Sequence, residues 1–255
     1  MGLKTILITQ ARMSSTRLPG KILMEVGNTP LLKIHLDRLK KSKNIDKIIV
    51  ATTVNKEDDI IEKLVLDWGF EVFRGSENDV LDRFYQAVKK INPIWVVRVT
   101  SDCPLIDPKL VDKIIEVTQA EGNDYGSNVI EETFPDGQDV EVFKFTALET
   151  AWKSAKKESE REHVTPYIRN NSNQKGKNIF SSISYKNNID YSRIRITVDE
   201  ANDFELINKV ITQLGFNKSW FEYTEYIINN KLVELNGNII RNEGYLKSLK
   251  NDQNG

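Results

Sequence analysis

Short apolar runs alternate with longer amphipathic segments through the first half of the chain. The runs are rich in Ile, Val and Thr, do not alternate clearly between apolar and polar positions, and cover residues 5–9, 47–53, 70–73 and 94–100. Such runs are typical of strands that are buried on both faces of a parallel sheet. Between them, apolar residues recur at intervals of three and four, which predicts helices over residues 30–42, 56–69 and 78–91. Because strands and helices alternate, we expect a doubly wound α/β fold with right-handed crossovers.

The pattern loosens after about residue 123. Shorter β-like runs with Asn, Gly and Pro turns occupy residues 124–143 and 178–199, and a charged helical stretch at 146–171 separates them. We predict an antiparallel β extension, about residues 124–195, that lies over the parallel sheet.

Two further helices are predicted near residues 200–214 and 219–230, and a polar tail follows them. No internal repeat, low-complexity segment or linker interrupts the sequence. A chain of 255 residues can bury a sizeable core. We therefore predict one domain over residues 1–255, with the antiparallel extension inside it.

Charge and cysteine content restrict the class of function. A formal net charge of -1 at pH 7 gives no global attraction to nucleic acid, so an anion site must be local. The single cysteine, Cys103, excludes an intramolecular disulfide and a cysteine zinc cluster, and suits a reducing compartment. No signal peptide and no apolar run of roughly 20 residues is found. We expect a cytoplasmic protein that binds neither nucleic acid nor membrane.

The segment "QARMSSTRLPGK", residues 10–21, follows the first predicted strand and carries Arg12, Arg17 and Lys21. Ligands of open parallel sheets bind at the carboxyl ends of the strands. Three cations spaced along one loop there can neutralise a triphosphate from several sides. The loop has neither the GxxxxGK[ST] nor the GxGxxG spacing, so we expect a different phosphate cradle. The alternative is a solvated basic loop.

Two aspartates follow β-like runs in the same way. Asp102, in "RVTSDCPLIDP", ends the run at 94–100, and Asp199, in "RIRITVDEANDFELI", ends a second predicted strand. Mg²⁺ is commonly held by one or two carboxylates while substrate phosphates complete its shell. The alternative for Asp102 is a turn cap. Asp203 lies in the first turn of the next predicted helix, where we expect it to complement the helix dipole.

Several segments resemble the cytidylyltransferases that activate acidic sugars, the group of CMP-KDO synthetase and CMP-acylneuraminate synthetase. The segments are "ARMSSTRLPGK", "SDCPLID", "GQDVEVF" and "VDEANDFELI". The branch named for the spore coat polysaccharide protein SpsF is the most similar, since "SENDVLDRFYQA", "EREHVTPYI" and "RNEGYLKS" also resemble it. The resemblance spans nearly the whole chain. It implies a Rossmann-like GT-A nucleotidyltransferase fold, a three-layer α/β sandwich, and usually a homodimer built through the antiparallel extension.

The resemblance also implies where the nucleotide binds. CTP would lie on the loop after the first strand, and its phosphates would be surrounded by Arg12, Ser15, Arg17 and Lys21. Asp102 and Asp199 would take the places of the Mg²⁺ ligands of the family. Ser101 stands where many relatives have glycine beside the metal-binding aspartate, and its side chain could narrow the approach to the nucleotide.

The acceptor would bind in the extension, where the candidates are Asp139, Glu141 and His163. The alternation in "GQDVEVF" is also what a plain half-buried strand shows, and a histidine beside a charged helix is commonly structural. An acidic acceptor needs a cation for its carboxylate, and the candidates in the extension are Arg161, Arg169 and Lys177.

The implied reaction is in-line displacement at the α-phosphorus of CTP by a sugar hydroxyl, giving a CMP-sugar and pyrophosphate for surface polysaccharide or glycan synthesis. Phosphoryl transfers of this kind depend on positioning and charge neutralisation, and the catalytic candidates are Arg17, Lys21 and Asp102. The main alternative is a nucleotidyltransferase that acts on a phosphorylated sugar or alcohol and gives an NDP-linked product. A GT-A glycosyltransferase is less favoured because "DCPLID" is not a DxD motif, and a non-catalytic nucleotide-binding module would not need both acids.

Overall fold

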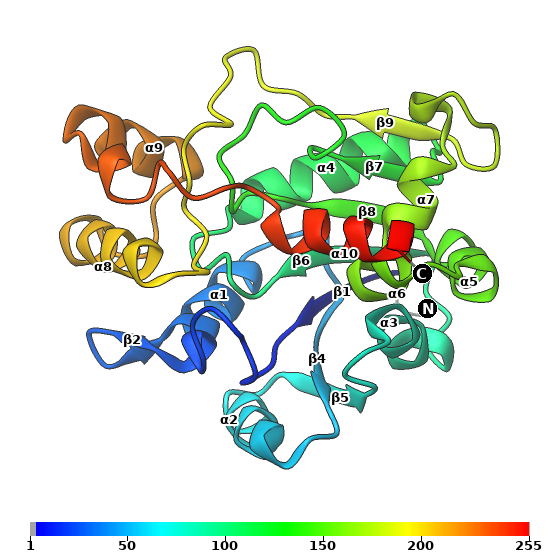
Figure 1. Cartoon of the computed structure of the whole chain (residues 1–255), viewed down its shortest axis with the longest axis horizontal. Coiled ribbons are helices and arrows are strands. Elements are labelled where there is room, and N and C mark those ends of the chain that lie inside the picture. The colour runs from blue at the N-terminus through cyan, green and yellow to red at the C-terminus, as the bar shows by residue number, and fades with distance from the viewer. Residues whose placement is uncertain (1–3, 255) are drawn as a thin grey trace.

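A seven-stranded sheet runs through the centre of the molecule in the order β5-β4-β1-β6-β8-β7-β9 (Figure 1). The computed structural model describes residues 4–254. β1, β4, β5 and β6 pair with one another in parallel. Their bounds are Thr5–Gln10, Lys47–Thr53, Glu71–Gly75 and Trp95–Thr100. These are the four apolar runs of the sequence, so the prediction of a parallel sheet is confirmed.

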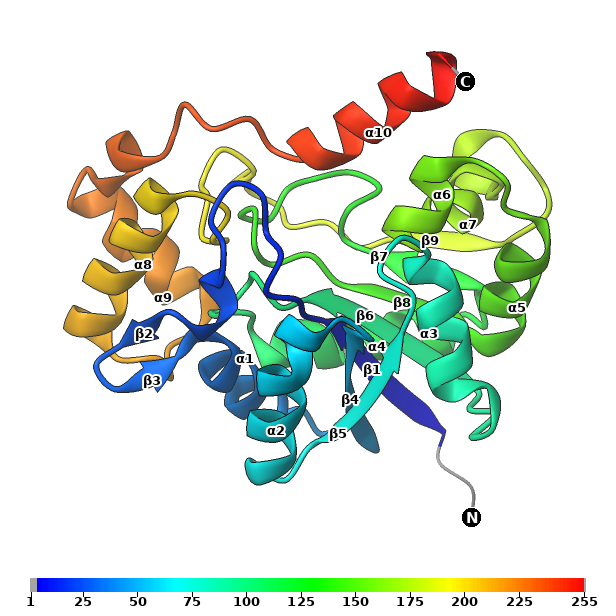
Figure 2. The same cartoon turned by 60° about the horizontal axis from the view of Figure 1, so that its bottom comes forward.

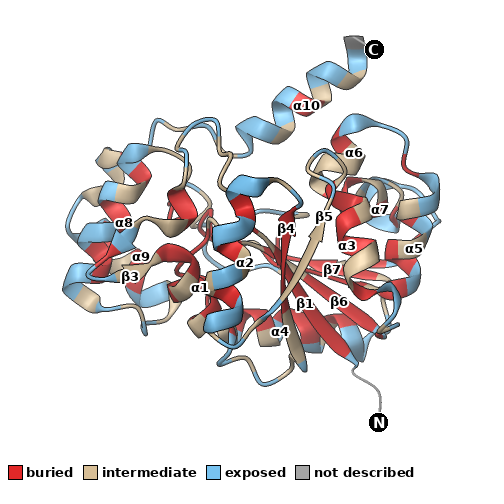
Figure 3. Cartoon of the chain, turned by 90° about the horizontal axis from the view of Figure 1, so that it is seen from below, coloured by how far each residue is buried: buried red, intermediate tan, exposed pale blue. Residues whose placement is uncertain are grey.

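Helices cover both faces of the sheet, which makes three layers. Ile6 and Ile8 of β1 pack in one core cluster with residues of α3, whereas Leu7 packs in another with residues of α4. The three side chains have no exposed surface, and Figure 3 shows most of the length of the central strands as buried. The helices that follow the parallel strands are α1 (Leu31–Leu39), α2 (Asp59–Asp67), α3 (Val80–Lys89) and α4 (Pro108–Ala120).

The extension continues the central sheet, which corrects the expectation that it lies over the sheet. β8 (Glu141–Lys144) pairs antiparallel with β6, and β7 (Tyr125–Ser127) pairs antiparallel with β8. β9 (Ser182–Ser184) then pairs with β7 in parallel. The edge of β6 offers unpaired backbone groups, and the extension satisfies them. Its helices are α5 (Phe145–Ser154), α6 (Glu158–His163) and α7 (Pro166–Asn170).

Residues 193–198 were predicted to form a strand, but they are extended and form only one isolated bridge, between Arg195 and Asp136. Ile196 N donates to Asp136 O at 2.8 Å, and Val198 N donates to Asp102 O at 2.8 Å. The partners belong to two separate loops, so no continuous ladder forms. The segment instead binds the loop after β6 to the extension.

The end of the chain folds into three helices. α8 (Ala201–Leu214) and α9 (Trp220–Asn229) occur where the sequence predicted them. The predicted polar tail contains a further helix, α10 (Glu243–Asn254). In Figure 2, α10 crosses from the side of α8 and α9 toward α6 and stands above the sheet. It packs on α6 and buries little apolar surface, which explains why hydrophobic periodicity did not reveal it.

The remaining regular elements are short. They are β2 (Glu25–Val26), β3 (Thr29–Pro30), and the 3₁₀ turns η1 (Lys21–Leu23), η2 (Lys56–Asp58), η3 (Asn173–Lys175) and η4 (Leu232–Leu235). Across residues 4–254, every helix is too short or too polar to span a lipid bilayer.

Candidate active site

The loop after β1 is fixed at its middle and at its end. Met13 N donates to Asp58 Oδ1 at 2.8 Å, and Asp58 has no exposed surface. Gly20 N donates to Met13 O at 3.0 Å, which closes the loop. Gly20 has φ +70°, a left-handed conformation that glycine adopts without strain. The loop therefore presents its cations from a backbone that is already in place.

Lys21 lies between the two aspartates that the sequence singled out. Its Nζ is 2.8 Å from Asp199 Oδ1 and 3.3 Å from Asp102 Oδ2. Burial would lower the pKa of Lys21, but the two carboxylates outweigh burial and raise this pKa above its ordinary value. Burial would likewise raise the pKa of Asp102, yet the charge of Lys21 and hydrogen bonds to the carboxylate lower it to about 2. Lys21 and Asp102 are therefore both charged at neutral pH.

Asp102 is brought to Asp199 by backbone contacts. Thr197 Oγ1 donates to Asp102 O at 3.0 Å, two residues before Asp199. Ser101 Oγ donates to Gln10 O at 2.6 Å and joins the ends of β1 and β6. The Ser101 hydroxyl is thus used in a contact between two strand ends, and Ser101 is 5% exposed.

Arg17 contacts the same oxygen of Asp199 as Lys21 does. Arg17 Nη2 lies 2.9 Å from Asp199 Oδ1, and Arg17 Nη1 lies 3.2 Å from Glu243 Oε2 and 3.8 Å from Glu200 Oε1. A guanidinium among three carboxylates can exchange one of them for a phosphate oxygen. Arg17 and Lys21 are thus brought together at Asp199.

Arg12 and Ser15 lie on the outer part of the loop. Arg12 Nη1 is 3.1 Å from Glu77 Oε1, and its side chain is 42% exposed. Ser14 Oγ donates to the same Glu77 oxygen at 3.0 Å. Ser15 Oγ accepts from Leu18 N at 3.5 Å. The structure does not bring these residues into the Lys21 cluster.

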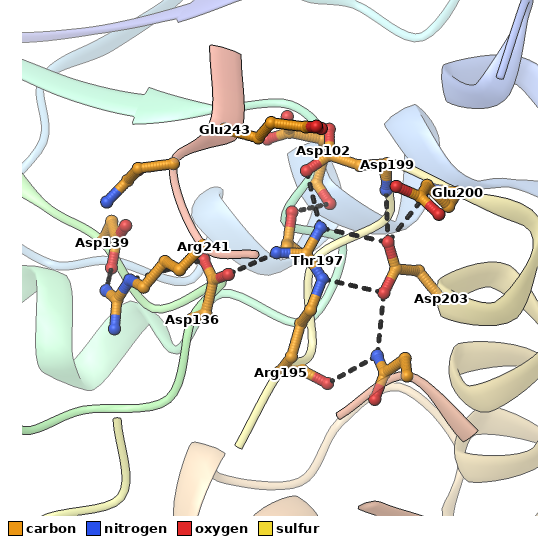
Figure 4. Close-up of polar contacts among 12 residues, drawn as sticks. Asp102, Asp136, Asp139, Arg195, Thr197, Asp199, Glu200, Asp203, Arg241 and Glu243 are labelled. Carbon is orange, nitrogen blue, oxygen red and sulfur yellow. Dashed lines mark hydrogen bonds and ion pairs between the residues drawn. The ribbon is translucent and has the colours of Figure 1, made fainter. Parts of the chain in front are cut away.

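Behind Asp199 stands a second ion cluster, centred on Arg195 (Figure 4). Arg195 contacts Asp199 at 2.7 Å and Asp203 at 2.9 Å, and also contacts Asp136. Asp203 accepts from Glu200 N at 3.0 Å as part of the capping box of α8. Its expected place in the first turn of this helix is confirmed, and it holds Arg195 as well.

The acceptor candidates lie in a separate group in the extension. Glu141, on β8, lies 2.6 Å from Arg98 of β6 and accepts from Tyr125 Oη at 2.5 Å. Burial would raise the pKa of Glu141, but Arg98 and other nearby donors lower it. Glu141 is 4% exposed, so its carboxylate is bound by Arg98 and Tyr125 in the interior of the sheet.

Asp139 and His163 have shifted pKa values for the same physical reason. Burial raises the pKa of Asp139 to about 7, although Arg241 lies 2.7 Å from its Oδ1 and opposes the shift. Burial lowers the pKa of His163 to about 4. Both residues contact the segment that leads into and forms α10, since His163 Nε2 lies 3.1 Å from Ser248 Oγ.

Sequence reasoning missed the cations that join these groups. Arg195 Nη1 binds Asp136, and Arg241 Nε lies 3.8 Å from that aspartate and so links it to Asp139. Arg98 and Arg195 carried a signal, because each is a charged residue inside an apolar run, "IWVVRVT" and "RIRITVD". A charge within a buried strand requires a partner. Arg241 carried no such signal.

The donor set at Lys21 fits Mg²⁺. Asp102 and Asp199 both lie within 3.3 Å of one ammonium nitrogen, so their oxygens surround one cation position. Within residues 4–254, no group of three His, Cys, Asp or Glu side chains could hold a metal by itself. Two carboxylates suit an ion that takes its other ligands from phosphates and water.

Known proteins share this arrangement of the chain. A family model described as Cytidylyltransferase matches residues 6–234. An uncharacterized protein of Methanocaldococcus jannaschii is 46% identical over 80% of this chain and 82% of its own length. The spore coat polysaccharide biosynthesis protein SpsF of Bacillus subtilis is 33% identical over 82% of this chain and 87% of its own length.

Two other comparisons bear on the chemistry. A 3-deoxy-manno-octulosonate cytidylyltransferase of Bartonella tribocorum is 32% identical over 52% of this chain and 56% of its own length. The structure of a cytidylyltransferase from Leptospira borgpetersenii superposes with a TM-score of 0.86 at 36% identity and covers 94% of this chain and 100% of that chain.

Proposed function

Because this chain belongs to the cytidylyltransferase family, we propose that it transfers CMP from CTP to a hydroxyl of an acidic sugar and releases pyrophosphate. The observation that carries the proposal is the position of Lys21, whose ammonium joins Asp102 and Asp199 at the carboxyl edge of the sheet. The Lys21 ammonium is held in a fixed position at this edge, where it can bind the negatively charged phosphates of a nucleotide. The name of the Bartonella relative supplies the acidic sugar as the acceptor class.

The cations of the loop would bind the triphosphate by exchanging partners. Arg17 and Lys21 are now held by carboxylates of the chain, and phosphate oxygens would replace some of these contacts. Lys21 would then stabilise charge on the α-phosphate and the leaving pyrophosphate. The acceptor hydroxyl oxygen forms a bond to the α-phosphorus as the bond to pyrophosphate breaks, and its proton is released to water. Fixed cations lower the barrier without a covalent intermediate.

Asp102 and Asp199 are the residues that would hold Mg²⁺. When bound, the ion would neutralise phosphate charge and polarise the α-phosphate. The two carboxylates are ordered without it because Lys21 contacts both of them and Arg195 contacts the second oxygen of Asp199. Their placement therefore comes from the fold.

Arg169 is the cation that best fits the carboxylate of an acidic acceptor. Arg161 is occupied, because its Nε lies 3.0 Å from Asp79 Oδ1 and its Nη1 donates to Trp152 O at 2.8 Å. Arg169 instead lies over the ring of Tyr245, 5.3 Å from its centroid. Within residues 4–254 Arg169 forms no ion pair within 4.0 Å, although its charge, after that of Arg98, helps lower the pKa of buried Glu141.

The test is pyrophosphate release with Mg²⁺, in which CTP, UTP, GTP and ATP are each combined with free acidic sugars and with sugar or polyol phosphates. We expect release with CTP and a free acidic sugar, and loss of release when EDTA removes the divalent ion. Release only with a phosphorylated acceptor would overturn the acceptor class and favour the NDP-linked product. Release that is insensitive to EDTA would overturn the metal assignment.

A further inference from the structure

The C-terminal strap, defined here as residues 241–254, lies beyond the family match at 6–234 and extends across the candidate site. In Figure 2 it bridges the two sides of the molecule above the carboxyl edge of the sheet. Its second residue, Asn242, has φ +58°, a left-handed conformation that asparagine tolerates better than most residues. This turn directs α10 from the nucleotide side toward the extension.

The first end of the strap binds Arg17 of the nucleotide side and Asp139 of the acceptor group. Glu243 Oε2 lies 3.2 Å from Arg17 Nη1, and Arg241 Nη2 lies 2.7 Å from Asp139 Oδ1. Among the three carboxylates around Arg17, Glu243 is the most exposed at 54%, compared with 40% for Glu200 and 17% for Asp199. Exposed ion pairs contribute little free energy, so an incoming phosphate would displace Glu243 from Arg17 at a lower cost than the other two carboxylates.

The second end binds the acceptor side. The ring of Tyr245 meets the ring of His163 edge to face at 5.1 Å, and Arg169 lies over Tyr245. Ser248 Oγ donates to Glu162 Oε2 at 2.6 Å. The proposed acceptor cation therefore has a strap residue as its neighbour.

Polar contacts hold the strap in place. Ser248 is the one residue of Glu243–Ser248 that is buried, at 4% exposure, and Leu246 is 46% exposed. Elements with little buried apolar surface belong to the least stable part of a fold and can open locally. Among the described residues, no strap residue belongs to a hydrophobic core cluster or packs against one.

We propose that the C-terminal strap completes the substrate site: Tyr245 positions Arg169 and His163 for the acceptor, and Glu243 competes with the triphosphate for Arg17. The inference rests on the proposed function, because it assigns the strap to the CTP and acceptor sites. In the absence of nucleotide, the carboxylate of Glu243 occupies the position on Arg17 that a phosphate of CTP would take. CTP binding then frees the first end of the strap, and the second end continues to cover the acceptor.

Calorimetry with CTP and Mg²⁺ tests the nucleotide half on the full-length protein. We expect Glu243→Gln to bind CTP about threefold to tenfold more tightly than wild type, because the competing charge is gone. The matched control is Glu234→Gln, which removes the same charge from an exposed position ahead of the strap and should stay within about twofold of wild type. Unchanged or weaker binding by Glu243→Gln would overturn the proposal.

Steady-state kinetics test the acceptor half, with the free acidic sugar that supports pyrophosphate release as the probe. Tyr245→Ala should raise the KM for the acceptor at least about fivefold and leave the Kd for CTP unchanged, whereas Tyr245→Phe keeps the ring and should restore the KM. Equal losses for acceptor and CTP would show a general structural defect and overturn the role. If no acidic sugar in the panel reacts, the proposed acceptor class fails, while the CTP comparison still decides the role of Glu243.

Discussion

Two ion clusters meet at Asp199, and they differ in what their cation is able to do. Arg195 is 6% exposed, and its three nitrogen atoms all contact carboxylates, including Asp203, which has no exposed surface. Lys21 contacts carboxylates that remain 27% and 17% exposed. The Arg195 cluster is closed, whereas the Lys21 cluster is open to a ligand. The two clusters therefore differ in how deeply the carboxylates around the cation are buried, more than in the number of ion pairs. The buried Arg195 cluster supports the fold, and the more exposed Lys21 cluster is the candidate site.

The Arg195 cluster also orders the working site. Arg195 holds Asp199 at 2.7 Å while Lys21 binds the other oxygen of the same carboxylate. The carboxylate is therefore fixed from the protein side before any ligand arrives. Preorganised groups of this kind cost no reorganisation during a reaction.

The largest expected effect is on stability, from Arg195→Met. Removing one partner of a buried ion cluster leaves uncompensated charge and costs about 3–5 kcal/mol. Lys21→Met should cost about 1 kcal/mol, because its carboxylates can be hydrated. Urea unfolding of both variants measures the difference. Equal losses would show that the two clusters are equally structural and would break the comparison.

The next effect is on turnover. Lys21→Ala should reduce pyrophosphate release about 10²-fold, as expected when one preorganised charge is removed from the site. Lys113→Ala is the control, since Lys113 is an exposed lysine of α4 and lies outside the site loops. It should retain wild-type turnover. Retained turnover in Lys21→Ala would remove Lys21 from the catalytic assignment.

The smallest effect concerns pH and the acceptor side. The pKa of His163 is lowered by burial from 6.5 to about 4, so between these values the unfolded chain binds a proton that the folded chain does not. The free energy of unfolding therefore falls as pH falls below about 6.5. His163→Gln should lessen this fall by about 2 kcal/mol between pH 7.5 and pH 5, measured by urea unfolding at both values.

A second histidine also contributes to the pH dependence of the free energy of unfolding, so removing His163 cannot abolish that dependence. The pKa of His35 is also lowered to about 4 by complete burial, so it adds to the same pH dependence. In His163→Gln, the increase of the free energy of unfolding with pH should therefore become smaller but remain. A slope equal to that of wild type would mean that His163 is solvated in solution and that the strap does not cover it.

Local pattern predicted most of the regular elements. The runs at 5–9, 47–53, 70–73 and 94–100 became the four parallel strands, because continuous apolar segments of that length are stable only inside a covered sheet. The capping role of Asp203 was predictable because it depends on the sequence immediately around it. These features need no knowledge of distant residues.

Other features followed no local rule. The extension was expected over the sheet, yet β8 joins the edge of β6, since antiparallel pairing satisfies groups that the sequence does not reveal as unpaired. Residues 193–198 have a strand-like pattern but pair with two different loops. α10 has little buried apolar surface and so no periodicity to detect.

The sequence by itself determined three features: the parallel core, the two aspartates at the ends of predicted strands and the cationic loop after the first strand. Each of them is encoded by neighbouring residues. The tertiary structure decided which charges meet. Lys21 and Asp199 are 178 residues apart, and their 2.8 Å contact exists only because the fold brings the loop after β1 to the segment before α8. Side-chain charge is fixed by residue type, whereas its partner and its burial depend on the packing of the whole chain.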